Sequence, residues 1–149
     1  MKIDEEIQQG SFQSSRQKAI INIMFTNGWI SHQFKEIFKN FSLTNQQYNV
    51  LRILRGAYPK SLNPGEIKEV MLDKNPDLTR LCDRLYKLGY IERCIDAANK
   101  RKMNIRINDD GMQILDEMDP VVNGMHESKF SLSEEEAQKL SDLLDKLRG

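Results

Sequence analysis

The stretch NPDLTRLCDRLYKLGYIERCIDAANKRKMNIRI, residues 75–107, decides the fold. Its first half predicts an amphipathic helix from Asn75 to Leu88, because its apolar residues recur at helical spacing: Leu78, Leu81, Cys82, Leu85 and Leu88. Gly89 then suits the residue just past a helix end. The second half reads as two strands, Ile91 to Ile95 and Met103 to Ile107, the latter with alternating apolar residues. A polar, basic loop joins them, so the stretch predicts a groove-reading helix followed by a wing.

Working outward, apolar periodicity predicts further helices over residues 11–40, 46–56 and 66–72 before this stretch, and two more after Asn108 and Ser133. Thr44 with Gln47 and Ser133 with Glu136 have capping-box spacing. Asn63-Pro64 and Asn75-Pro76 each offer an N-cap followed by proline at the first helical position.

The predicted fold class is mainly α with a small β-hairpin: a winged helix-turn-helix flanked by N- and C-terminal dimerisation helices. We expect an N-terminal dimerisation helix in residues 1–42, a DNA-binding lobe in residues 43–107 and C-terminal dimerisation helices in residues 108–149, together one integrated domain. The outer helices are too apolar to be solvated alone, so a second copy is expected to bury them.

Charge is uneven although the chain of 149 residues has a net charge of zero. Residues 74–107 hold nine basic and four acidic residues, a net charge of +5, whereas residues 108–149 hold four and eleven. Phosphate affinity depends on local cations, so a neutral total permits DNA binding. An ordinary solvated surface with uneven charge is the alternative. The polar N-terminus is no secretory signal, and no apolar run is long enough to span a membrane. With two cysteines, both within apolar patterns, a reducing cytoplasm is the simplest location.

The N-terminal part of a reading helix reaches base edges in the major groove, which selects Asp77, Thr79 and Arg80, with Arg84 one turn further on. Arginine can pair with guanine or hold phosphates, and sequence does not assign the two jobs. An exposed helix face with i,i+4 charge support explains this pattern slightly better when it is taken alone. The candidate DNA-contacting set is Asn63, Lys74, Asn75, Asp77, Thr79, Arg80, Arg84, Asn99, Lys100, Arg101 and Lys102.

Four segments together resemble the MarR family of bacterial transcription regulators: LTNQQYNVLRIL (43–54), NPGEIKEVML (63–72), LTRLCDRLYKLGYIER (78–93) and NKRKMNIRINDDG (99–111). The resemblance implies a homodimeric winged-helix repressor or activator that binds double-stranded DNA at a pseudo-palindromic operator and is usually released by a small ligand or oxidant. By position, Asn63 to Leu72 resembles the first helix of the DNA-binding pair and Asn75 to Leu88 the recognition helix.

Arg101 matches the wing arginine that family members place in the minor groove. The family commonly has Asp two residues earlier to brace it, and this chain has Asn99, which loses the charge-assisted part of that bond. Asp96 is an alternative brace. This departure and the neutral charge keep open a rival hypothesis, a winged-helix module that docks on a partner protein and does not bind DNA.

Other candidate sites have simpler explanations. Cys82 and Cys94 fit buried, inert thiols better than redox switches. His32 and His126 lack the neighbours of a metal site, so no metal or other cofactor is expected. Core packing explains the aromatic residues of the first long helix as well as an effector cavity does: Phe25, Trp29 and Phe34. Acidic pairs lie at helix starts, where the helix dipole accounts for them, and no catalytic arrangement stands out, so we do not expect an enzyme.

Overall fold

Helices and one hairpin follow one another along residues 1–95 and 103–149, which are the residues that this computed structural model describes. In chain order they are α1 (Ile3–Glu6), α2 (Ser15–Lys39), α3 (Asn45–Ala57), α4 (Pro64–Val70), α5 (Leu78–Lys87), β1 (Ile91–Ile95), β2 (Met103–Ile107), α6 (Asp109–Lys129) and α7 (Glu134–Arg148). The mainly helical fold class with a small antiparallel hairpin is therefore confirmed. By contacts the chain forms two compact units, 1–115 and 116–149, which divide inside α6.

Three predicted helix starts have the side-chain caps that the sequence indicates, at Thr44, Asn63 and Ser133. Thr44 Oγ1 accepts a hydrogen bond from the Gln47 amide at 3.2 Å, and the Gln47 side chain accepts one from the Thr44 amide at 2.9 Å. The same reciprocal box joins Asn63 to Glu66 and Ser133 to Glu136. Each box satisfies two backbone donors that a helix start leaves without a partner.

The predicted starts of two helices are wrong. Helix α2 begins at Ser15 with Ser14 as its cap, not at Ser11. Helix α5 begins at Leu78 with Asp77 as its cap, so Asn75 lies outside it. The Asn75 amide instead donates to Asp73 Oδ1 at 2.9 Å, which holds the turn before the helix. No sequence pattern predicted α1, and α4 ends at Val70, two residues before the predicted end.

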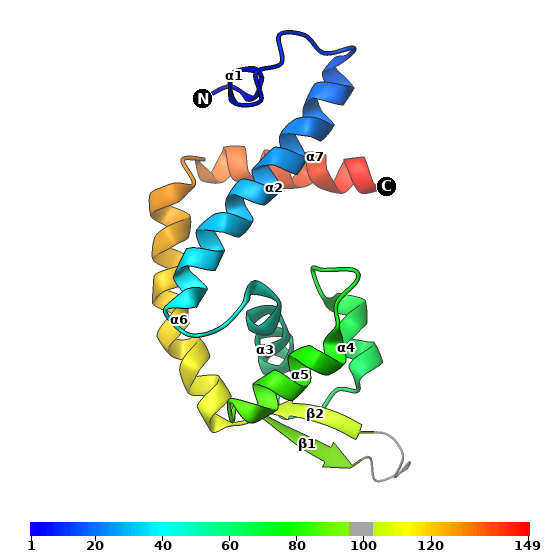
Figure 1. The fold of residues 1–149 in the computed structure, drawn as a ribbon, viewed down its shortest axis with the longest axis vertical. Helices are drawn as coiled ribbons and strands as arrows, with labels where there is room; N and C mark the ends of the chain where they lie inside the picture. The colour runs from blue at the N-terminus through cyan, green and yellow to red at the C-terminus, as the bar shows by residue number, and fades with distance from the viewer. Residues whose placement is uncertain (96–102) are drawn as a thin grey trace. The chain divides into compact units, whose positions relative to one another are not determined.

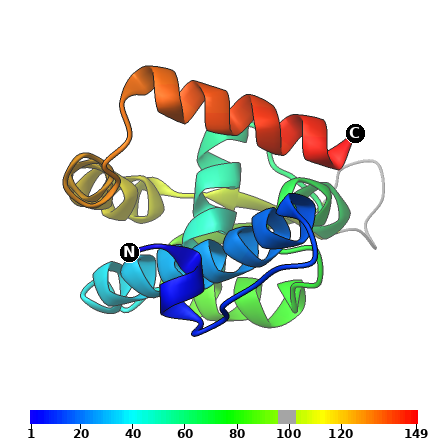
Figure 2. The same cartoon turned by 90° about the horizontal axis from the view of Figure 1, so that it is seen from above.

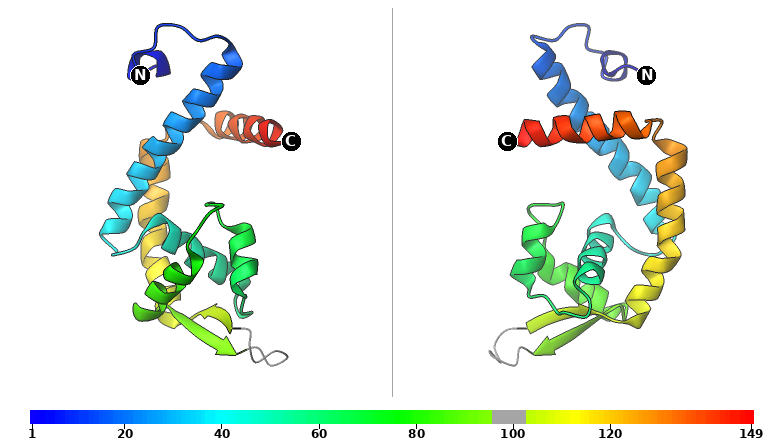
Figure 3. Two further views of the ribbon diagram at one scale, coloured as in Figure 1. Left: turned by 45° about the vertical axis from the view of Figure 1, so that its right-hand side comes forward. Right: turned by 180° about the vertical axis from the view of Figure 1, so that it is seen from behind.

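The core of the first unit forms where α3, α4 and α5 meet the hairpin (Figures 1 and 3). One apolar residue or more from each of these elements is fully or almost fully buried: Val50, Leu51, Leu54, Ile67, Leu85, Ile105 and Ile107. Four of the five residues in the predicted apolar stripe of α5 are buried: Leu78, Leu81, Cys82 and Leu85. The fifth, Leu88, is the C-cap of the helix and is 38% exposed. The exposed side of α5 is therefore set by how the helix packs.

The hairpin has an inner and an outer face. Register pairs Ile91 with Ile107, Arg93 with Ile105, and Ile95 with Met103, and partners in register share a face. Leu62, before α4, adds a short bridge: its amide donates to the Ile105 carbonyl at 2.9 Å and its carbonyl accepts from the Ile105 amide at 2.8 Å. This bridge, which sequence analysis did not predict, ties the start of the helix-turn-helix to the wing.

The junction from hairpin to α6 is tightly built. Asn108 Nδ2 donates to the Gly89 carbonyl at 2.7 Å, and Asn108 Oδ1 accepts from the Gly111 amide at 2.9 Å, which confirms Asn108 as the cap of α6. Gly89 has φ +79°, as its predicted place past the end of α5 requires. A Cβ on Gly111 would lie 2.2 Å from the Tyr90 carbonyl oxygen, so this position needs glycine.

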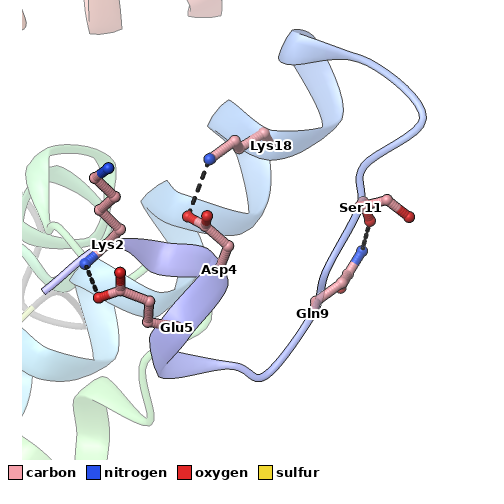
Figure 4. Close-up of polar contacts among 6 residues, drawn as sticks. All are labelled: Lys2, Asp4, Glu5, Gln9, Ser11 and Lys18. Atoms are coloured by element: carbon pink, nitrogen blue, oxygen red, sulfur yellow. Dashed lines mark hydrogen bonds and ion pairs between the residues drawn. The ribbon is translucent and has the colours of Figure 1, made fainter.

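The N-terminal turn α1 lies beside the start of α2 (Figure 2). Lys18 Nζ donates to Asp4 Oδ1 at 3.0 Å (Figure 4). Ile3 of the same turn is buried. The Lys18 hydrogen bond lowers the pKa of Asp4. Among the helices in the described ranges, none is both long and apolar enough to cross a bilayer.

Candidate nucleic-acid interface

The exposed side of α5 gathers the predicted reading residues. Thr79, Arg80 and Arg84 are exposed, and with Asp77, Asp83 and Lys87 they line one open hollow of about 400 Å³. The spacing of Arg80, Arg84 and Lys87 follows from the helix, because residues three and four apart share a face. Lys87 belongs to this surface although it was not in the candidate set. The helix thus presents three cations on the side opposite its buried leucines.

The candidate residues that precede α5 include two helix caps, Asn63 and Asp77. Asp77 Oδ1 accepts from the Arg80 amide at 3.1 Å and caps the helix. Lys74 is exposed, and its Nζ lies 3.5 Å from the Glu69 carbonyl oxygen. Asn75 is also exposed, and Asn63 is half-buried with its side chain engaged as the cap of α4. Lys74, Asn75 and Asn63 therefore flank the α5 surface rather than line its hollow.

One acidic residue on α5 is engaged by the hairpin. Arg93 of β1 donates to Asp83 Oδ1 and forms an ion pair with it. The Arg93 guanidinium carbon also lies 4.6 Å from the centre of the Tyr86 ring. Asp83, Tyr86 and Arg93, here called the clasp, join the recognition helix to the first strand. Sequence analysis did not predict it, because Asp83 and Arg93 are ten residues apart on different elements.

The hairpin has the form expected of a wing. On its outer face Arg106 donates to Glu92 at 2.8 Å, which raises the pKa of Arg106. Ile95 and Met103, the last inner-face pair before the loop, are 72% and 50% exposed. The candidates Asn99, Lys100, Arg101 and Lys102, and the alternative brace Asp96, lie outside the described residues.

A second cavity, of about 550 Å³, lies where α2, α3 and the turn after α4 meet. Its wall combines apolar and amide side chains, among them Phe34, Met71, Asn45 and Asn49. Asn49 Oδ1 accepts from the Leu72 amide at 2.9 Å, whereas Asn45 Oδ1 is buried without a hydrogen-bond partner among the described residues. Phe34 thus lines a cavity, while Phe25 and Trp29 are exposed on α2 at 39% and 41%.

Asp73 fixes the turn at this cavity. Its carboxylate accepts from the Asn75 amide and from the Gln46 side chain, and these bonds lower its pKa, the Asn75 bond most. The turn Met71–Lys74 precedes α5 by three residues. The cavity is therefore lined in part by the segment that precedes α5.

The remaining sequence candidates show no ligand-binding geometry in the described ranges. Cys82 is buried, and burial raises its pKa to about 11, as expected of an inert thiol. Cys94 is half-buried on the hairpin's outer face, less buried than predicted. His32 and His126 are exposed, and residues 1–95 and 103–149 contain no cluster of three metal-ligating side chains.

A short helix, a second helix with an exposed cationic side and a two-stranded hairpin together define a winged helix-turn-helix protein. The family model of the MarR family matches residues 43–103. The crystal structure of a MarR transcription factor from Planctomyces limnophilus is similar with a TM-score of 0.70 and 30% identity, over 93% of this chain and 98% of that one. This chain belongs to the MarR family, and it is a winged-helix transcription regulator rather than an enzyme.

Two further relatives are informative. The HTH-type transcriptional regulator PecS of Dickeya dadantii is 26% identical over 121 residues, which cover 79% of this chain and 72% of PecS. A crystal structure of Staphylococcus aureus MepR in complex with DNA is 25% identical with a TM-score of 0.71, over 83% of this chain and 94% of that one. The resemblance stated from the sequence is therefore confirmed.

Proposed function

We propose that this protein is a dimeric, sequence-specific DNA-binding regulator, a repressor whose DNA affinity a small ligand lowers. The observation that carries the proposal is the exposed side of α5, where Arg80, Arg84 and Lys87 face away from the buried stripe beside a hairpin. The relative MepR has been crystallised with DNA, which supports a duplex as the partner. The two free cysteines suit a reducing compartment, in accord with a place in the cytoplasm.

In this proposal α5 enters the major groove with its N-terminal turn first. Thr79 and Arg80 reach base edges, and Arg84 and Lys87 hold phosphates along the groove wall. Asn63, Lys74 and Asn75 approach the backbone beside the helix start. Asp77 contributes by capping α5, which keeps the first turn intact. By the family resemblance, Arg101 enters the flanking minor groove, and Asn99, Lys100 and Lys102 are further candidates for contact with DNA.

A second copy of the chain is the partner that the outer helices fit. Apolar side chains at helical spacing are exposed on both helices: Ile20 and Met24 on α2, and Leu140, Leu143 and Leu147 on α7. Helices of this kind gain stability by burying that stripe. A two-fold dimer would present two copies of α5 to half-sites about one helical turn apart, which means a pseudo-palindromic operator.

The cavity between α2, α3 and the Met71–Lys74 turn is the proposed effector site. Asn45 Oδ1 is buried and accepts no hydrogen bond from the described residues, so a ligand with a hydrogen-bond donor would fit there. An effector that prefers the turn in a position unsuited to the operator would shift the population away from DNA binding. Asn45→Leu should then abolish release of operator by such a compound while operator affinity stays close to that of the wild type.

The decisive experiment selects bound fragments from a random duplex pool. Expected is one enriched inverted repeat, bound with an affinity that falls steeply as salt rises, by a log–log slope of about −0.9 per phosphate contact. Arg80→Ala should lower the affinity at least tenfold and relax selectivity at one base position, and Arg101→Ala should weaken binding at the flank. Arg16→Ala, an exposed arginine at the start of α2, is the matched control.

An absence of duplex binding at low salt would contradict the proposal. A stable complex with another protein in the same experiment would instead favour the docking-module hypothesis, which the comparisons do not favour. Selected sequences without an inverted repeat would contradict only the two-fold docking and not DNA binding itself.

A further inference from the structure

Asp83 lies on the side of α5 that the proposed function turns toward DNA, and yet its carboxylate is engaged by the protein. It lines the same hollow as Arg80 and Arg84, while its Oδ1 accepts from Arg93 of β1. A free carboxylate here would repel phosphates, and the ion pair with Arg93 offsets that charge. An acid on a DNA-facing surface therefore has a role within the protein.

The clasp lies where the buried part of the hairpin ends. On the inner face, the pair Ile91 and Ile107 is buried, and Ile105 opposite Arg93 is 4% exposed. The next pair, Ile95 and Met103, is largely exposed. Apolar packing thus holds the base of the hairpin against the lobe, and Arg93 holds its middle through its contacts with Asp83 and Tyr86.

We propose that Asp83 is a positioning residue for operator binding. Through Arg93 and Tyr86 it fixes the angle between the recognition helix and the wing. This angle sets the distance between the base pairs that α5 reads and the minor-groove segment that the wing enters. This role rests on the proposed function: the clasp selects the spacing of the two DNA segments, and not their base sequence. Exposed ion pairs contribute little stability, so the consequence of losing this one is expected in geometry.

The chain contains a matched control for the clasp. Glu92 and Arg106 form an ion pair of similar exposure, but both lie on the hairpin. Asp83→Asn and Glu92→Gln each remove one negative charge and one ion pair. Only Asp83→Asn removes a contact between the strand and the helix. A change in DNA affinity that both variants share is therefore electrostatic, and a change found only in Asp83→Asn comes from loss of the clasp.

The experiment measures spacing tolerance on the operator obtained by selection. One base pair is inserted or deleted between the half-site core and its flanking minor-groove segment. Wild type and Glu92→Gln are expected to lose at least tenfold in affinity for the altered duplexes, while Asp83→Asn loses less than threefold. Asp83→Glu, which keeps the carboxylate, should restore most of the discrimination. Equal discrimination by Asp83→Asn and wild type, or an equal rise in affinity for every duplex in both charge variants, would overturn the inference.

A second measurement needs no DNA. Residual dipolar couplings of the free protein report the orientation of α5 relative to the hairpin. One alignment tensor should fit both elements in wild type and in Glu92→Gln, whereas Asp83→Asn should need a reduced order for the hairpin. Unchanged couplings in Asp83→Asn would overturn the clasp itself. If the wild type binds no duplex, the proposed function is wrong, and the role of Asp83 in spacing is wrong with it. Couplings that still change in Asp83→Asn would then show that the clasp itself exists and that only the proposed function is wrong.

Discussion

Helices α5 and α7 carry the same kind of leucine stripe, but the stripe of α5 is buried and that of α7 is exposed. In α5, Leu78 and Leu81 are each 8% exposed and Leu85 is fully buried. In α7, Leu140, Leu143 and Leu147 are 46–56% exposed, although a capping box starts this helix. The lobe therefore completes the apolar environment of α5 from within one chain. The stripe of α7 also has the composition of a buried surface, but its leucines are left exposed within one chain.

The largest effect is expected from breaking the completed stripe. Leu85→Ala removes a fully buried side chain at the centre of the lobe and leaves a cavity. It should lower the free energy of unfolding by about 2–5 kcal/mol, measured by urea denaturation. Leu88→Ala, at the 38% exposed end of the same stripe, is the control and should cost much less. Similar losses for the two variants would contradict a lobe packed around α5.

Two glycines on α6 sharpen the comparison, because one lies in the first unit and the other in the second. Gly111→Ala would place a methyl 2.2 Å from the Tyr90 carbonyl oxygen and 2.7 Å from Ile107 Cγ1, and should destabilise by about 1–3 kcal/mol. A methyl on Gly124 would meet no described atom of another element within 4 Å, so Gly124→Ala should stabilise the helix by up to about 1 kcal/mol. Thermal unfolding of both variants checks the pair, and shifts of the same sign would refute the contrast.

The open stripe is tested by Leu143→Ala. A leucine that a second copy covers would contribute to association in both protomers, so its loss should raise the dimer dissociation constant by about tenfold or more. Sedimentation velocity over a concentration series measures this effect. Ser141→Ala, on an exposed position of the same helix, is the control. Wild-type association in Leu143→Ala would remove α7 from the interface.

Local patterns predicted most of the helices and both strands, because their signals lie within a few residues of one another. Thr44, Asn63 and Ser133 each cap the helix that their spacing with a Glu or Gln indicates. The predicted start of α5 was wrong for a physical reason, because Asn75 and Asp77 are both residue types that cap helices well and lie two residues apart. The Asp73 carboxylate decides between them by accepting from the Asn75 amide.

Sequence reasoning found the candidate site residues on α5, but it missed the contacts that join α5 to other elements. Helical spacing is enough to put Arg80 and Arg84 on one exposed side. The pairing of Asp83 with Arg93 and the bridge from Leu62 to Ile105 depend on how the elements meet in space, which no short pattern contains.

The smallest effect concerns the two thiols, one within the completed stripe and one outside it. Burial raises the pKa of Cys82 from 9.0 to about 11, so at pH 8 only about one molecule in a thousand carries the reactive thiolate. The variant Cys94→Ser, which leaves Cys82, should react with a disulfide reagent at least tenfold more slowly than Cys82→Ser, which leaves the half-buried Cys94. Because folding raises this pKa, the stability that Cys82 contributes is complete below pH 9 and is lost as pH rises through about 11. Equal rates for the two variants would mean that α5 opens readily from the lobe, and the redox role that burial argues against would then require a direct test with oxidant and operator.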